Sequence, residues 1–140
     1  MNMPMIITGT LGMDSHIIGT KILSRALKEA GFRVTALGSY TPIEDFLKAA
    51  QEAKADAILI SSLYGMAEFD LKGFKEKKME AGLGDVIYYI GGNLVIGRQE
   101  HKEVEKKFKE LGFDRVYPTD TDLDAAINDL KNDLKAKRKM

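Results

Sequence analysis

Residues 5–19, MIITGTLGMDSHIIG, decide the fold, because an apolar segment runs through a glycine-containing loop into a helical pattern. Residues 5–9 have the length and apolar character of a buried strand. Residues 16–30 repeat apolar side chains at helical spacing and stop before Gly31, a common helix terminator. The expected buried face of this helix consists of Ile18, Ile22, Ala26 and Ala30. The chain therefore opens with a strand, a loop and a helix.

The same unit recurs along the rest of the chain. Further strands are expected at residues 33–37, 57–61, 86–90 and 115–117, and further helices after Thr41, at 68–81, around Val104 to Leu111 and from Leu123 to Leu134. Alternating strands and helices give a parallel sheet with right-handed crossovers and helices on both faces. The five units predict an α/β fold with a doubly wound, five-stranded parallel sheet, flavodoxin-like (Rossmann-like), in the order 2-1-3-4-5.

The start of the second helix carries the clearest local signal. Thr41 is expected as the capping residue, Pro42 at the first helical position and Glu44 at the third. The predicted buried face of this helix is Ile43, Phe46, Leu47 and Ala50. At the other end of the chain, residues 131–140 contain five Lys or Arg and are expected to be a fraying helix end on the surface.

The composition is typical of one globular domain, residues 1–140, with 44% hydrophobic and 30% charged residues. Its 21 basic residues balance 21 acidic ones, so nothing indicates nucleic-acid binding. No apolar run is longer than a strand and no basic leader precedes one, which predicts no membrane span, no secretory signal and a cytoplasmic location. Without cysteine the chain has no disulfide or thiolate ligand, and its soft metal ligands are His16 and His101, the latter expected to be solvated.

The first loop points toward a ligand site. In a sheet of this order, ligands bind at the carboxyl ends of the first and third strands, where the strand order reverses. His16 is expected there, and a neutral imidazole is a good ligand for a transition metal. Asp14 is placed to accept a hydrogen bond from the second ring nitrogen. A simpler alternative stays open, in which Asp14 caps the helix and His16 is solvated on its first turn.

Two further loops follow the third and fourth strands. The third strand ends in Ser61-Ser62-Leu63, and residues 91–97 form a glycine-containing loop after the fourth. Glycine lets a bulky flat ligand approach the backbone, and a serine hydroxyl at a strand end can bond a ring nitrogen. Taken singly, the glycines indicate a tight turn, and Ser61 is a serine at a strand end whose hydroxyl is hydrogen-bonded within the protein. Together the loops predict a slot.

The order of these motifs resembles that of cobalamin-binding domains. Asp-x-His-x-x-Gly stands at residues 14–19, Ser-x-Leu at 61–63 and Gly-Gly at 91–92. The chain further resembles the small, sigma subunits of glutamate mutase over nearly its whole length, in segments that include residues 61–65, 91–93 and 112–118. Met66 and Ala67 depart from the pattern of that family.

The resemblance implies how the chain holds cobalamin. His16 would be the lower axial ligand of cobalt in place of the cofactor's own dimethylbenzimidazole, and Asp14 would accept the other imidazole N–H. Gly19 would let the helix begin close to the nucleotide tail. The loop against the lower corrin face would be Met13, Asp14, Ser15, His16 and Ile17.

The resemblance also implies where the displaced base goes. The tail would enter the slot between the first and third strands, where the Ser61 hydroxyl would bond the benzimidazole. One side of the slot would be lined by Ser61, Ser62 and Leu63, and the opposite wall by Gly91, Gly92, Asn93, Leu94, Val95, Ile96 and Gly97.

Sigma subunits belong to an enzyme that needs a second chain. The resemblance implies an adenosylcobalamin-dependent isomerase that interconverts L-glutamate and threo-3-methylaspartate, with radical chemistry supplied by the cobalt cofactor. A larger barrel-type epsilon subunit would bind L-glutamate, in an assembly of two plus two subunits. This chain would contribute no catalytic residue beyond the cobalt-ligand pair His16 and Asp14.

Three rival functions share the predicted sheet. A corrinoid carrier for methyl transfer would have the same pocket, but the missing N-terminal helical cap disfavours it. A signalling receiver needs a phosphorylatable aspartate at the end of the third strand, where Ser61 stands. A flavin site needs a hydroxyl-rich first loop to hold phosphate, and residues 9–13 offer only Thr10.

Overall fold

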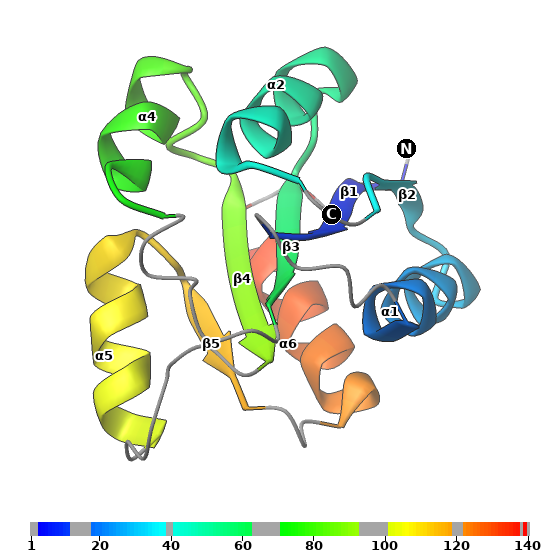
Figure 1. The fold of residues 1–140 in the computed structure, drawn as a ribbon. Helices are drawn as coiled ribbons and strands as arrows, with labels where there is room; N and C mark the ends of the chain where they lie inside the picture. Colours follow the sequence, from blue (N-terminus) through cyan, green and yellow to red (C-terminus); the bar gives the residue numbers. More distant parts are fainter. Residues whose placement is uncertain are drawn as a thin grey trace.

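The structure, a computed structural model, describes residues 3–11, 18–38, 41–62, 71–92, 101–118, 122–137 and 139, with the backbone alone at 18–20 and 101. Five strands form one parallel sheet in the order β2-β1-β3-β4-β5, which confirms the predicted topology (Figure 1). The strands are β1 (Met5–Thr10), β2 (Arg33–Ala36), β3 (Ala57–Ser62), β4 (Ile87–Gly92) and β5 (Arg115–Tyr117).

Helices cover both faces of this sheet. One face carries α1 (Ile18–Glu29) and α6 (Leu123–Ala136), and the other carries α2 (Ile43–Ala53), α4 (Phe74–Glu80) and α5 (His101–Leu111) (Figure 1). Among the described helices, none has the length and apolar character needed to cross a membrane. Because all strands are parallel, the chain leaves β1, β3 and β4 at the same edge of the sheet, which we call the carboxyl edge.

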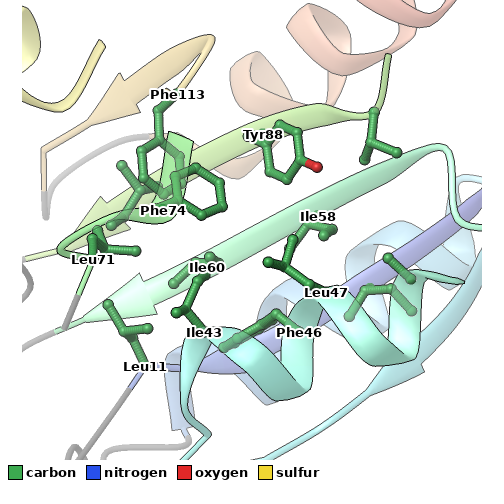
Figure 2. Close-up of a cluster of buried hydrophobic side chains, with 14 of the residues drawn as sticks. Leu11, Ile43, Phe46, Leu47, Ile58, Ile60, Leu71, Phe74, Tyr88 and Phe113 are labelled. Atoms are coloured by element: carbon green, nitrogen blue, oxygen red, sulfur yellow. The ribbon is translucent and has the colours of Figure 1, made fainter. Parts of the chain in front are cut away.

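The larger hydrophobic core lies between the sheet and α2, α4 and α5 (Figure 2). Phe74 of α4 is fully buried, with its ring centroid 4.9 Å from that of Phe113 in a stacked arrangement and 5.1 Å from that of Tyr88, which it meets edge-on. The Tyr88 hydroxyl is satisfied inside this core, since it donates to the Leu83 carbonyl oxygen at 2.7 Å. These rings fix α4 against β4.

The predicted buried face is confirmed for the second helix and is partly wrong for the first. Ile43, Phe46, Leu47 and Ala50 of α2 are all buried. On α1, Ile22 is 54% exposed, whereas Leu27 is fully buried. A smaller core lies between the sheet and the helices α1 and α6. The residues that pack on it here are Leu23, Ala26 and Leu27 of α1 and Ala30 just after that helix. Turning the two leucines inward buries more apolar surface than a face of Ile22 and alanines, so the helix presents them to the sheet.

The predicted capping arrangement at the start of α2 is wrong. Pro42 is the N-cap residue, with φ −70° and ψ 157°, and it makes no side-chain capping hydrogen bond. Thr41 is held beside β1 instead, because its backbone N–H donates to the Thr10 carbonyl oxygen at 3.0 Å. Its hydroxyl donates to the Gly38 carbonyl oxygen at 3.3 Å. The extended backbone of Pro42 therefore delays the helix by one residue.

The helix predicted at residues 68–81 is shorter in the structure. Residues 71–73 form a turn, and α4 begins only at Phe74. Gly73 has a φ of 78°, a left-handed conformation that interrupts an α-helix. Residues 68–70 lie outside the described part of the chain.

The C-terminal segment is anchored rather than frayed. The helix α6 continues to Ala136, and the Lys139 Nζ lies 3.7 Å from Asp56 Oδ1 and 3.6 Å from Asp85 Oδ2. The side chain of Lys139 is only 16% exposed. Since Asp56 and Asp85 stand just before β3 and β4, this end of the chain is tied to the amino edge of the sheet.

Candidate functional site

Four residues from four strands lie side by side at the carboxyl edge of the sheet. Thr10 pairs in register with Ser61, Ser61 with Gly91, and Gly91 with Tyr117. Register partners in parallel strands point to the same face. Leu59, two residues before Ser61, packs in the core under α1 and α6, so this row lies on the face that those helices cover. We call Thr10, Ser61, Gly91 and Tyr117 the edge row.

Gly91 leaves a space within the edge row. Neighbouring strands lie about 4.8 Å apart, so Ser61 and Tyr117 flank a position without a side chain. A Cβ atom at Gly91 would lie 3.4 Å from the Tyr117 Cβ and 3.5 Å from its carbonyl oxygen, so any larger side chain would narrow this space. With a hydroxyl on one side and an aromatic ring on the other, the space suits a flat heterocycle that has a ring nitrogen.

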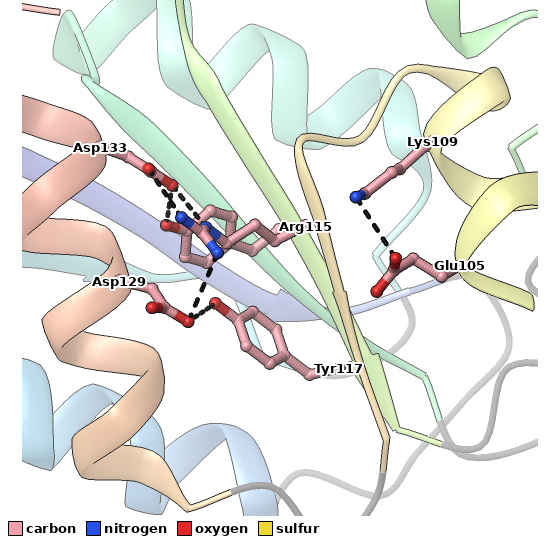
Figure 3. Close-up of polar contacts among 7 residues, drawn as sticks. Glu105, Lys109, Arg115, Tyr117, Asp129 and Asp133 are labelled. Carbon is pink, nitrogen blue, oxygen red and sulfur yellow. Dashed lines mark hydrogen bonds and ion pairs between the residues drawn. The ribbon is translucent and has the colours of Figure 1, made fainter. Parts of the chain in front are cut away.

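The ring of Tyr117 is held from α6. Its hydroxyl donates to Asp129 Oδ2 at 2.8 Å (Figure 3). Burial, reinforced by this hydrogen bond, raises the pKa of the Tyr117 hydroxyl above its ordinary value, so the group stays a protonated donor at neutral pH. The edge row is thereby connected to α6, the helix that follows β5.

A second set of contacts joins α6 to β4 and β5. Arg115 donates two hydrogen bonds to Asp133, at 2.8 and 3.1 Å, and the Tyr89 hydroxyl donates to the same carboxylate (Figure 3). The hydrogen bond from the Arg115 guanidinium holds the pKa of Asp133 below its ordinary value. This bidentate geometry is the stronger form of an ion pair. The position of α6 over the edge row is therefore fixed by side chains of its own.

The two predicted serines point to opposite faces of the sheet. Ser61 shares the face of the edge row, whereas Ser62 follows Ile60 on the face of α2 and α4. The Ser62 hydroxyl is fully buried and has no hydrogen-bond partner within the described part of the chain. Leaving such a group unsatisfied costs about 1–3 kcal/mol. A polar group from outside the described residues is expected to bond it.

The structure places only some of the predicted site residues. It brings Ser61, Ser62, Gly91 and Gly92 together at the ends of the adjacent strands β3 and β4. Gly92 has a φ of 108°, which favours glycine there. Gly19 lies in the first turn of α1. The remaining predicted residues lie outside the described part of the chain, namely Met13, Asp14, Ser15, His16, Ile17, Leu63, Asn93, Leu94, Val95, Ile96 and Gly97.

Sequence reasoning missed three residues that the structure adds. Thr10 and Tyr117 end β1 and β5, and Asp129 lies on α6. The rule that ligands bind at strand ends could have found Tyr117. In the residues that the structure describes, no group of three or more His, Cys, Asp or Glu side chains could hold a metal ion.

Two solved structures share this fold. A novel cobalamin-binding protein from Desulfitobacterium hafniense DCB-2 has a TM-score of 0.75 and 20% identity, over 94% of this chain and 59% of that one. The signal receiver domain of NarL from Mycobacterium tuberculosis has a TM-score of 0.70 and 15% identity, over 96% of this chain and 98% of that one. At such identities the likeness shows the fold alone.

The B12 binding domain family matches residues 4–127. With the sheet order and the edge row, this match defines a flavodoxin-like cobalamin-binding domain. The glutamate mutase sigma subunits of Carboxydothermus hydrogenoformans and Clostridium cochlearium are 54% and 51% identical to this chain, over 92% of it and 94% of each of theirs. The chain belongs to the family of glutamate mutase sigma subunits.

Family membership confirms several predictions made from the motifs. The chain is a cobalamin-binding subunit of an isomerase, and the cofactor of that enzyme is adenosylcobalamin. A sigma subunit implies a partner, which is the epsilon subunit predicted above.

Proposed function

We propose that the chain holds adenosylcobalamin at the carboxyl edge of its sheet, with His16 as the lower cobalt ligand and the displaced dimethylbenzimidazole in the space above Gly91. This space lies on the other side of β3 from the slot between β1 and β3 that was expected from the sequence. The edge row is the observation that carries this proposal, because its Ser61 hydroxyl and Tyr117 ring flank a position without a side chain. When bound, the cofactor supplies the radical chemistry of the carbon-skeleton rearrangement. This chain binds and orients the cofactor.

The predicted residues have different tasks in this proposal. Ser61 donates its hydroxyl to the ring nitrogen of the base, and Asp14 accepts the second N–H of the His16 imidazole. The loop of residues 13–17 packs against the lower corrin face, and Gly19 lets α1 begin close to the nucleotide tail. Leu63 and residues 93–97 complete the walls of the slot.

The partner subunit completes the site in this proposal. A larger barrel-type epsilon subunit binds L-glutamate, and the two subunit types assemble two plus two to interconvert L-glutamate and threo-3-methylaspartate. Support comes from relatives that are sigma subunits of glutamate mutase along nearly their whole length.

The cobalt ligand is tested by paramagnetic resonance of the reduced cobalamin complex. With protein labelled by the heavy nitrogen isotope and unlabelled cofactor, the nitrogen splitting of the cobalt signal is expected to change from a triplet to a doublet. This change requires a ligand nitrogen from the protein. His16→Gln is expected to abolish the change, and His101→Gln, the control, to preserve it. A triplet that persists in labelled unaltered protein shows that the cofactor's own base stays bound, and it refutes the proposal.

Asp14→Asn is expected to lower cobalamin affinity or turnover by about ten- to one-hundredfold, because the amide no longer provides a charged acceptor for the imidazole N–H. Titration of the protein with adenosylcobalamin measures the affinity. The exposed Asp45 of α2 supplies a matched control, since Asp45→Asn is expected to change neither property. If Asp14→Asn leaves affinity and turnover intact while Asp14→Ala lowers stability by about 1 kcal/mol, the residue is only a helix cap.

A further inference from the structure

The helix α6 holds two tyrosines of the sheet by their hydroxyl groups. Tyr117 donates to Asp129 at 2.8 Å, and Tyr89 donates to Asp133 (Figure 3). Their rings meet at a centroid distance of 5.4 Å and an angle of 62°. The two tyrosines differ in depth, because Tyr117 belongs to the edge row whereas Tyr89 lies farther from the carboxyl edge, in register with Leu59.

Tyr117 needs support from α6 because β5 is an edge strand. It spans three residues and has only β4 beside it in the sheet. Tyr89, in contrast, is 2% exposed within a strand that has neighbours on both sides. The orientation of the Tyr117 ring is therefore set by its hydrogen bond to Asp129 and by its contact with Tyr89.

Asp129 is available to Tyr117 because Arg115, which lies at ion-pair distance, directs its close hydrogen bonds to Asp133. Arg115 donates both of its close hydrogen bonds to Asp133, and its Nη1 atom lies 3.8 Å from Asp129 Oδ2. The guanidinium thus attracts the Asp129 carboxylate while the Tyr117 hydroxyl makes the shorter contact. Both aspartates lie on the same side of α6, one turn apart, facing β4 and β5.

We propose that Asp129 is a positioning residue for the nucleotide base of the cofactor. It orients the Tyr117 ring, which forms the wall opposite Ser61 in the space above Gly91. This inference rests on the proposed function, which puts dimethylbenzimidazole in that space. A ring that is already held loses little conformational entropy when the base arrives, so the hydrogen bond contributes to affinity without touching the ligand.

Two probes separate this role from a general effect on stability. Adenosylcobinamide has the corrin and the adenosyl group of adenosylcobalamin but no nucleotide base. In the full-length chain, Tyr117→Phe and Asp129→Ala are expected to lower the affinity for adenosylcobalamin about tenfold and to leave that for adenosylcobinamide unchanged. Asp129→Asn is expected to retain most of the affinity, because its amide oxygen still accepts the hydroxyl.

Tyr89→Phe is the matched control. It removes the corresponding hydrogen bond to α6 from the deeper ring, so we expect a lower unfolding midpoint and an unchanged ratio of the two affinities. Two results overturn the inference while the proposed function stands. One is a fall in the ratio of the adenosylcobalamin affinity to the adenosylcobinamide affinity that is as large for Tyr89→Phe as for Tyr117→Phe. The other is an unchanged ratio for both Tyr117→Phe and Asp129→Ala. Equal affinity of the unaltered protein for both probes overturns the proposed function itself, and this inference with it.

Discussion

The purified chain, supplied with adenosylcobalamin and L-glutamate, is expected to form no detectable 3-methylaspartate. Recognition of a substrate with two carboxylates favours arginine forks, and the three arginines that the structure describes are engaged elsewhere. Arg25 pairs with a glutamate one turn along α1, and Arg33 donates to the Met3 carbonyl oxygen, just before β1. Arg115 is bonded to Asp133.

Proton NMR of the reaction mixture measures this result, with and without the epsilon subunit. Adding that subunit to the same preparation is expected to start turnover, which also shows that the cofactor site of the chain is intact. Isomerisation by a preparation that mass spectrometry shows to be free of other proteins contradicts the expectation, because it places the glutamate site on this chain.

Phe74→Ala is expected to lower the free energy of unfolding by about 3–5 kcal/mol. The fully buried ring stacks on Phe113, meets Tyr88 edge-on and lies 5.4 Å from the Lys78 Nζ. Its removal leaves a cavity beneath α4 and takes three neighbours out of contact. Urea denaturation without cobalamin measures the loss, since bound cofactor would add to the apparent stability.

Met79→Ala is the control on the same helix. Met79 is 62% exposed, so its truncation is expected to change the free energy of unfolding by no more than about 0.5 kcal/mol. A loss below about 1 kcal/mol for Phe74→Ala would falsify the packing of α4 described here, because a buried phenylalanine does not leave a core at so small a cost.

The sheet could be predicted because its signals are local. Alternation of apolar runs and helical patterns predicts a parallel sheet with right-handed crossovers, and β5 occupies the residues expected for it. The face of α1 could not be predicted in the same way, since Ile22 and Leu23 are adjacent and both begin an apolar stripe. Packing against the sheet chooses Leu23 and Leu27, and that choice depends on residues far away in the sequence.

The site could be predicted only as far as the strand ends. Ser61 and Gly91 follow from the rule for ligands at the reversal of strand order. Ser61 and Ser62 point to opposite faces of the sheet. Which of them faces α1 and α6 depends on how the sheet packs, and the sequence does not show this. The contact of Asp129 with Tyr117 depends on how α6 lies over β5, which no motif records.

The ion pairs of Lys139 with Asp56 and Asp85 indicate where a probe can be attached without blocking the edge row. They hold the end of the chain at the amino edge, and the six residues of β3 separate that edge from the edge row by about 20 Å. A fluorophore or an affinity tag attached at Lys139 would start from the edge of the sheet opposite the edge row. Immobilising the subunit at this end therefore leaves the carboxyl edge, where we propose that cobalamin binds, open for binding experiments.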